Sequence, residues 1–243
     1  MKQHEAVIKV LEENGGYATL NHLYHHVPLI SDCTWKTKTP QASIRRIVQE
    51  NERIFKIRPG LWALEDWRQE VLRKLGLVSA DQKKEVDFTH SYYQGLLVEL
   101  GNLGKYDTYV PPQDQNKLFL ETPLKNLVTT SKIYPFTYDS VLGNATTIDV
   151  IWFNSRRFPH AFFEVEHSTD MQNSLVKFVE LQDFFVHFYM VSGGSRKREF
   201  ESKIVKSAFT AVSDRVRFLD YEYVSNWHAK AHALLHATGG DGV

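Results

Sequence analysis

Apolar residues in the first part of the chain change their spacing at about residue 50. Up to that point they recur every three or four residues, which indicates helices, and beyond it they form two short runs typical of strands. Breaks in the pattern fall at Gly15-Gly16, at Pro28 and at Thr39-Pro40. The expected helices span about residues 4–13, 19–27 and 40–50, and the expected strands span 54–57 and 61–64. The pattern predicts three helices followed by a hairpin.

The third of these helices has one apolar face and one polar face. The apolar face consists of Ile44, Ile47 and Val48, and the polar face carries Gln41, Arg45, Arg46 and Gln49. Side chains of this kind read base edges and phosphates. The hairpin adds Lys56 and Arg58, which suit phosphate contacts. Three helices and a hairpin form the winged helix-turn-helix order, so we expect these six residues to bind DNA.

Basic residues are concentrated in the same region. The whole chain is balanced, with 29 Lys and Arg against 29 Asp and Glu. Between Cys33 and Gly60, however, seven basic residues face two acidic ones, Glu50 and Glu52. The seven are Lys36, Lys38, Arg45, Arg46, Arg53, Lys56 and Arg58. A nucleic-acid surface would therefore be local to this region.

The rest of the chain alternates between helical and strand-like segments. A connecting helix is expected at about 66–76, and the polar stretch 79–87 predicts a domain boundary. We then expect a helix from Thr89, a strand at 106–110, and strands at 148–153 and 160–165. A helix capped by Ser168 or Thr169 follows, whose Leu175, Phe178, Val179 and Phe185 face inward. After it we expect a strand at 187–191, a helix at 196–213, a strand at 216–221 and a helix at 225–237. The period of residues 113–145 is ambiguous.

The two strands at 148–153 and 160–165 form an expected hairpin that contains acids. If its turn is centred between Arg156 and Arg157, cross-strand partners have residue numbers that sum to 313, which places Asp149 opposite Glu164. Their Cβ atoms would lie roughly 5 Å apart. Glu166 projects on the same face, because side chains alternate along a strand. Three carboxylates are therefore expected on one patch.

Such a patch needs a positive partner, because desolvated carboxylates repel each other. Oxygen-only ligands favour a hard divalent cation, Mg²⁺ or Mn²⁺. The alternative is a structural ion-pair cluster in which Arg156, Arg157 or His167 neutralises the acids. The histidines do not have the spacing of a zinc site.

Composition narrows the setting. A hydrophobic content of 42% predicts a packed globular protein. Cys33 is the single cysteine, which excludes an internal disulfide and suits a reducing compartment. The first residues are charged and do not resemble a signal peptide, and no apolar run approaches the ~20 residues of a membrane span. We therefore expect a cytoplasmic protein with no membrane partner.

The stretch TPQASIRRIVQENERIFKIRPGLWAL resembles the HARE-HTH winged-helix family. It shares a Thr-Pro helix start and a late Pro-Gly-aromatic-Ala-Leu wing, and the resemblance covers about residues 1–65. It implies DNA binding, since members of the family occur in chromatin-associated proteins and fused to restriction-type nucleases. The alternative is a winged helix that contacts proteins.

The order of elements over about residues 88–221 resembles the PD-(D/E)XK nuclease superfamily. In that resemblance Asp149 takes the aspartate position, Glu164 the second acid, and Glu166 the position usually held by lysine. Glu99, on the helix before the first strand, takes an additional acid position. The resemblance implies catalysis by Asp149, Glu164, Glu166 and Glu99, with Asp149, Glu164 and Glu99 as ligands of Mg²⁺ or Mn²⁺.

Glu166 departs from the usual lysine, although some restriction enzymes of the superfamily have Glu-x-Glu here. Glu166 could act as a general base or as a metal ligand, and Lys177 could supply the positive charge. For Lys177 we favour the simpler interpretation, a solvated helix residue.

Together these patterns predict an α/β (α+β) protein. Its expected parts are a winged helix-turn-helix at 1–65, a connecting helix and linker at 66–87, and a restriction-endonuclease-like mixed sheet flanked by helices at 88–243. The expected function is metal-dependent DNA cleavage of restriction or defence type by a homodimer on DNA, or by successive nicks. Two alternatives are a non-catalytic DNA-binding regulator on a degenerate nuclease fold and a nuclease for RNA or repair intermediates. A preference for modified bases is a further expectation from the resemblance.

Overall fold

The computed structural model describes residues 1–35, 39–78, 82–167 and 170–238. The chain forms two compact units, one of residues 1–81 with 225–243 and one of residues 82–224. Within the described residues, no helix combines the length and the apolar character that crossing a bilayer requires.

The first unit contains short helices and a three-stranded antiparallel sheet in the order β1-β3-β2. Its elements are α1 (Gln3–Glu13), β1 (Tyr17–Thr19), α2 (Leu20–His26), η1 (Val27–Leu29), α3 (Gln41–Glu50), β2 (Ile54–Arg58), β3 (Leu61–Leu64), η2 (Glu65–Trp67) and α4 (Arg68–Lys74). The expected helices and hairpin are all present. This is the element order that a winged helix requires, and the family resemblance of this part stays a prediction.

Local chemistry explains where these elements begin and end. Thr19 caps α2, because its hydroxyl accepts a hydrogen bond from the main-chain N–H of His22 (3.3 Å). Gly15 and Gly16 follow α1 with φ of +77° and +89°, values that residues with a side chain rarely adopt. The cap of α3 is Pro40 and not Thr39 as expected, so that helix begins one residue later.

The C-terminal helix α9 (Tyr221–Thr238) belongs to the first unit from Ser225 onward. Its Ala229 is buried in the same hydrophobic core as α1 and α3. The Ser225 hydroxyl donates a hydrogen bond to the Pro59 carbonyl in the β2–β3 turn (2.6 Å). The sequence placed this helix with residues 88–243, and that division into domains stays a prediction.

The second unit is built around a five-stranded mixed sheet in the order β10-β9-β8-β7-β4. β8, β9 and β10 are parallel, whereas β4, β7 and β8 are antiparallel neighbours. Its elements are α5 (Gln82–Leu103), β4 (Asp107–Tyr109), β5 (Leu118–Phe119), β6 (Thr122–Pro123), η3 (Leu124–Asn126), α6 (Asp139–Ala145), β7 (Val150–Phe153), β8 (Pro159–Glu166), α7 (Met171–Glu180), β9 (His187–Ser192), η4 (Gly194–Arg196), α8 (Lys197–Ile204), η5 (Ser207–Phe209) and β10 (Val216–Asp220). The predicted class, helices around a mixed sheet, is confirmed.

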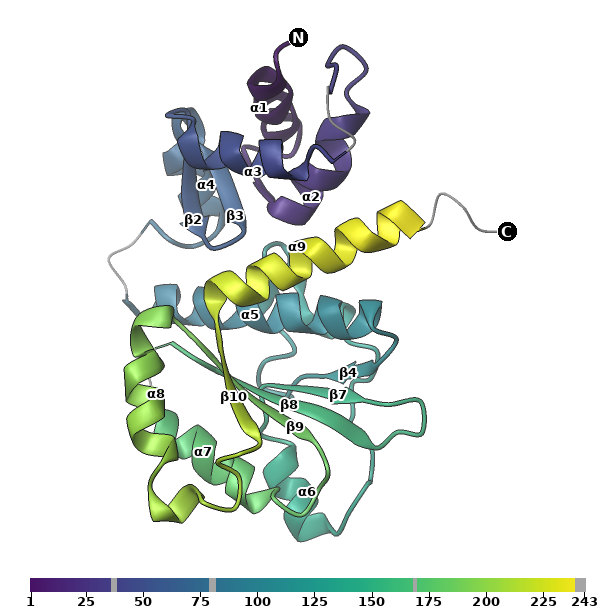
Figure 1. Ribbon diagram of the computed structural model, residues 1–243, viewed down its shortest axis with the longest axis vertical. Coiled ribbons are helices and arrows are strands. Elements are labelled where there is room, and N and C mark those ends of the chain that lie inside the picture. The colour runs from purple at the N-terminus through teal and green to yellow at the C-terminus, as the bar shows by residue number, and fades with distance from the viewer. Residues whose placement is uncertain (36–38, 79–81, 168–169, 239–243) are drawn as a thin grey trace. The chain divides into compact units, whose positions relative to one another are not determined.

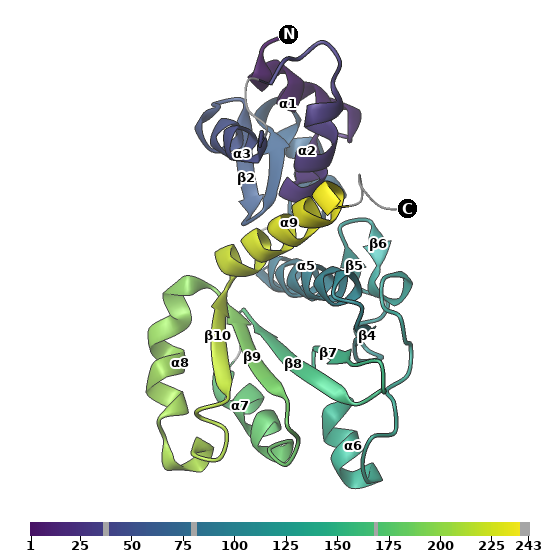
Figure 2. The same ribbon diagram turned by 45° about the vertical axis from the view of Figure 1, so that its right-hand side comes forward.

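Helices cover both faces of this sheet. Figures 1 and 2 show α5 along one face and α6 and α7 along the other. The side chains alternate accordingly. The indole N–H of Trp152 donates to the Leu97 carbonyl on α5 (3.0 Å), whereas the Phe188 ring lies 4.9 Å from the Phe178 ring on α7. Side chains on the two faces of the sheet therefore meet different helices.

Three sequence predictions need correction. α5 begins at Gln82 and not at Thr89, so residues 82–87 are helical and do not form a linker. α7 is capped by Asp170, whose carboxylate accepts from the main-chain N–H of Gln172 (2.9 Å); the expected caps at 168 and 169 lie outside the described residues. Phe185, expected to face inward, lies beyond the end of α7 and is fully exposed.

Candidate active site

The β7–β8 hairpin has the predicted register. Val150 pairs with Phe163, and Ile151 pairs with Phe162. Each pair of residue numbers sums to 313, so Asp149, the residue before β7, faces Glu164. The Asn154 side chain fixes the turn, because its oxygen accepts from the main-chain N–H groups of Arg156 (2.9 Å) and Phe158 (3.2 Å). The prediction that Asp149 and Glu164 meet is confirmed.

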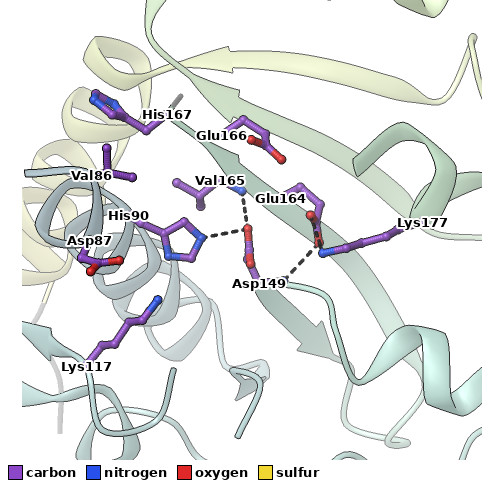
Figure 3. A pocket seen from close by; sticks show the side chains of 10 residues that line it. All are labelled: Val86, Asp87, His90, Lys117, Asp149, Glu164, Val165, Glu166, His167 and Lys177. Atoms are coloured by element: carbon purple, nitrogen blue, oxygen red, sulfur yellow. Dashed lines mark hydrogen bonds and ion pairs between the residues drawn. The ribbon is translucent and has the colours of Figure 1, made fainter. Parts of the chain in front are cut away.

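Asp149 is held by its main chain and by its side chain. Its N–H donates to Oε1 of Glu164 (3.3 Å), and its Oδ2 accepts from the N–H of Val165 (2.7 Å). On the other side, Nε2 of His90 on α5 lies 3.2 Å from Oδ2 of Asp149. Figure 3 shows His90 and Val165 converging on this carboxylate. Asp149 is therefore fixed between the hairpin and α5.

Glu164 is 1% exposed and faces α7. Nζ of Lys177 lies 3.0 Å from its Oε1 and 2.8 Å from its Oε2, and also donates to the Thr147 carbonyl (2.9 Å). The interpretation of Lys177 as a solvated residue is wrong. Met171 and Leu175 are buried on the apolar side of α7. With that side packed in the core, Ser174 and Lys177 face β8.

Glu166 lies two residues further along β8 and is also buried. The Ser174 hydroxyl is in hydrogen-bond contact with Oε1 of Glu166 and lies 3.0 Å from Oε2 of Glu164. A hydroxyl has a single hydrogen, so Ser174 can donate to only one of these two carboxyl groups. The other carboxyl group makes a hydrogen bond with the Ser174 oxygen when it carries a proton and donates it. The two glutamates thus share one hydroxyl at the base of the site.

Burial and charge move the pKa values of these groups in different directions. Burial and the negative charge of Asp149 raise the pKa of Glu164 well above its ordinary value. Burial likewise raises the pKa of Glu166. For Asp149, burial is outweighed by His90 and Lys177, which lower its pKa. Burial also opposes the charge on Lys177, but Glu164 and Asp149 raise the pKa of Lys177. Burial and neighbouring charges thus move the pKa of Asp149 down and the pKa values of Glu164 and Glu166 up.

A pocket of about 280 Å³ opens over these groups. Its lining includes His90, Lys117, Asp149, Glu164, Glu166 and Lys177 (Figure 3). His167 lines it too, and the Tyr221 hydroxyl lies 3.5 Å from Nδ1 of His167. Acids, two lysines and two histidines thus meet at one concave surface, which is typical of a catalytic or ion-binding site.

Glu99 is not among the described residues that line this pocket. It lies on α5 nine residues after His90, which corresponds to about 13 Å along the helix axis. The pocket therefore does not bring Glu99 to Asp149 and Glu164, and its expected role as a metal ligand stays a prediction. His90, from the same helix, contacts Asp149 instead.

Sequence reasoning did not identify His90 as part of the site. The available signal was the pair His90 and Gln94, two polar residues one helical turn apart in a segment with buried Tyr92, Tyr93 and Leu96. Both reach Asp149, since Nε2 of Gln94 donates to the Asp149 carbonyl (3.0 Å). Polar residues on a buried helix face need partners, and their partner here is the acidic hairpin.

The predicted DNA-binding residues differ in their surroundings. Arg46, Gln49 and Lys56 are exposed, and Arg46 lies 3.8 Å from Glu50. Gln41 is half-buried at the start of α3, and Arg58 donates to the Ile57 carbonyl (2.8 Å). Arg45 is the least available, because Nη1 donates to Oδ1 of Asn226 on α9 and its guanidinium also bonds Tyr24.

The fold and the pocket define a mixed α/β protein with a carboxylate-lined pocket at the β7–β8 hairpin. Comparison with family models identifies that class more closely: the model of the Type II restriction enzyme NmeDI C-terminal domain matches residues 73–239. The match covers more than half of the chain, which therefore belongs to this family. Comparisons with curated proteins and with solved structures found no match.

Proposed function

We propose that the protein is a divalent-metal-dependent DNA endonuclease of restriction type. The observation that carries this proposal is the convergence of Asp149 and Glu164 on one pocket, with Lys177 bonded to both oxygens of Glu164. Membership in a restriction-enzyme family supports the reaction class. The PD-(D/E)XK assignment of the hairpin is part of the proposal.

The residues present fit a hard cation. Asp149, directly before β7, and Glu164, on β8, are buried acids, and both need a positive partner. His90 lies beside Asp149 and Lys177 beside Glu164 as such partners. Oxygen donors of this kind suit Mg²⁺ or Mn²⁺, with the Val165 carbonyl as a further ligand. When bound, such an ion polarises a phosphate and lowers the pKa of water.

The protein's own side chains supply the rest of the chemistry. Lys177 carries a positive charge into the pocket, where it would stabilise negative charge that develops on the phosphate. Glu166 has a raised pKa and lines the same pocket, which suits a general base that accepts a proton from water. We therefore assign the role of the missing lysine to Lys177 and base catalysis to Glu166.

Target choice is assigned to the winged-helix-like unit. Arg46 and Gln49 lie exposed on α3, and Lys56 lies exposed on β2, where they suit contacts to bases and phosphates. The described residues form one such acidic hairpin site, and cutting both strands of a duplex usually takes two. The proposed active form is accordingly a homodimer on DNA, or a monomer that makes successive nicks.

A substrate panel tests the proposal. Full-length protein is incubated with Mg²⁺ and duplex DNA, duplex DNA with modified bases, single-stranded DNA or RNA. We expect cleavage of duplex DNA and a loss of at least about 10²-fold in Glu164→Gln. The matched control is Glu201→Gln, an exposed glutamate on α8. Binding of DNA without cleavage of any substrate would instead support a non-catalytic regulator, and equal cleavage by Glu164→Gln would contradict the assigned site.

A further inference from the structure

A second group of ligand atoms lies on the α5 side of Asp149. His90 on α5, Asp114 in the loop after β4, and Asp149 each offer one donor atom, and the three atoms lie within 4.8 Å of one another. Asp114 is 3% exposed and Asp149 is 9% exposed. Figure 3 shows His90 and Lys117 on the opposite side of Asp149 from Lys177. This group is thus separate from the Glu164 side of the pocket.

Gln94 is a fully buried amide that points into this group. Its Nε2 donates to Oδ2 of Asp114 (2.8 Å) and to the Asp149 carbonyl (3.0 Å). Its Oε1 has no hydrogen-bond partner among the described residues, and neither does Nδ1 of His90. Buried polar atoms are nearly always satisfied, and an exception inside a cluster of acids indicates a missing ion or ligand. Rotation of the amide would break these two hydrogen bonds and turn the unused oxygen toward the cluster, which a bound cation would favour.

The negative charge of Asp114 is balanced by a lysine side chain that can move away. Nζ of Lys117 lies 2.8 Å from Oδ1 of Asp114, and its side chain is 36% exposed. Lys117 can therefore swing into solvent, where an ammonium ion is well hydrated. Its departure would leave two buried carboxylates and an imidazole facing one point.

We propose that His90, Asp114 and Asp149 form a second divalent-cation site that takes Mn²⁺ in preference to Mg²⁺, with the Gln94 oxygen as a further donor. An imidazole ligand suits first-row transition ions, whereas Mg²⁺ prefers oxygen ligands alone. The site shares Asp149 with the proposed catalytic site and in that respect rests on the proposed function. It gives the chain one oxygen-only site and one mixed nitrogen and oxygen site.

Mn²⁺ titration of the full chain, followed by the electron paramagnetic resonance signal of free Mn²⁺, tests this site without a cleavage assay. Wild type should bind two ions per chain, and excess Mg²⁺ should displace one of them. His90→Ala and Asp114→Asn should weaken one ion by about tenfold or more, as changes around a metal commonly do. The control His187→Ala, an exposed histidine on β9, should bind as wild type.

Two further variants separate this inference from the proposed function. Glu164→Gln should keep the ion bound at His90 and lose the other. Lys117→Met removes the competing ammonium ion and should tighten Mn²⁺ binding, whether or not the alanine variants fold. A single ion that is lost in Glu164→Gln and insensitive to His90→Ala and Lys117→Met would overturn the second site and leave the proposed function standing. No bound ion in wild type would overturn both.

Discussion

Lys177 bonds both carboxylate oxygens of Glu164, at 3.0 and 2.8 Å, from a helix that follows the acidic hairpin. Glu166 occupies the strand position where the resemblance leads one to expect lysine. The positive charge therefore enters the pocket from α7 and not from β8. This arrangement keeps an acid-lysine pair in the site although the strand carries Glu-x-Glu.

Lys177→Met should slow DNA cleavage by about 10²-fold or more, which is the usual effect of removing one group that stabilises developing charge. The protein should stay folded, because the buried Glu164 side chain can take up a proton, and burial already raises its pKa. Single-turnover cleavage and thermal melting measure the two effects. The control is Lys197→Met, at an exposed lysine on α8. An equal loss of cleavage rate in the two variants would contradict the role assigned to Lys177.

Divalent ions should stabilise the folded protein, because they bind carboxylates that converge only in the native state. At a hundred times the dissociation constant the expected gain is about 2.7 kcal/mol of unfolding free energy. Melting in Mg²⁺, Mn²⁺ and EDTA measures it. Glu164→Gln should reduce the gain from Mg²⁺, whereas identical melting of wild type in all three solutions would favour a purely structural ion-pair cluster.

How far the sequence predicts this site depends on how local each contact is. The pairing of Asp149 with Glu164 follows from alternation along two adjacent strands and from the Asn154 turn, which are local features. The contact of His90 with Asp149 is tertiary, because it requires the position and rotation of α5 on the sheet. The sequence also placed the start of α5 seven residues too late, so its buried face was not identified.

Lys177 was misjudged for a related reason. The periodicity of α7 indicates which side is apolar, but not that a long side chain at the edge of that side reaches a buried acid. Exposed Phe185 shows the reverse error, since an apolar residue just beyond a helix end need not face the core. Residues 113–145 form short elements, which are the two-residue strands β5 and β6, the 3₁₀ helix η3 and the seven-residue helix α6, and this explains their ambiguous period.

The first unit should lose stability in mild acid through His22. Burial, together with repulsion from His26 and His25, lowers the pKa of His22 to about 4. Below pH 6.5 the unfolded chain takes up a proton at His22, whereas the folded chain resists it. The contribution of His22 to the free energy of unfolding should therefore be fully present above pH 6.5 and be lost as the pH falls toward 4. Because His22 is half exposed, the loss should be about 1–2 kcal/mol.

Denaturant titrations across this pH range measure the effect. His22→Gln should flatten the dependence, and His4→Gln on α1 is the control. A wild-type profile that stays flat would contradict the burial of a neutral His22.

Lys56→Ala should weaken DNA binding equally for all sequences and lower the slope of log affinity against log salt by about one, as expected for a phosphate contact. Arg46→Ala should cost roughly 1–3 kcal/mol and relax selectivity if Arg46 reads a base. Asn226→Ala releases Arg45 from α9, and tighter binding in that variant would show that α9 restrains Arg45. Filter binding or fluorescence anisotropy over a range of salt concentrations provides these values. Unchanged salt slopes in Lys56→Ala would point to a winged helix that contacts proteins.

The central claim is that Asp149 and Glu164 hold a divalent metal with which the protein hydrolyses DNA. The variant Asp149→Asn tests this claim most directly. The amide oxygen can still accept the hydrogen bond from the N–H of Val165, so the fold should persist while the charge is lost. The measurement is the rate of supercoiled-plasmid cleavage in Mg²⁺ by wild type and by Asp149→Asn. The account predicts cleavage by wild type and at least about a 10²-fold loss in the variant. Equal rates in the two proteins would contradict it.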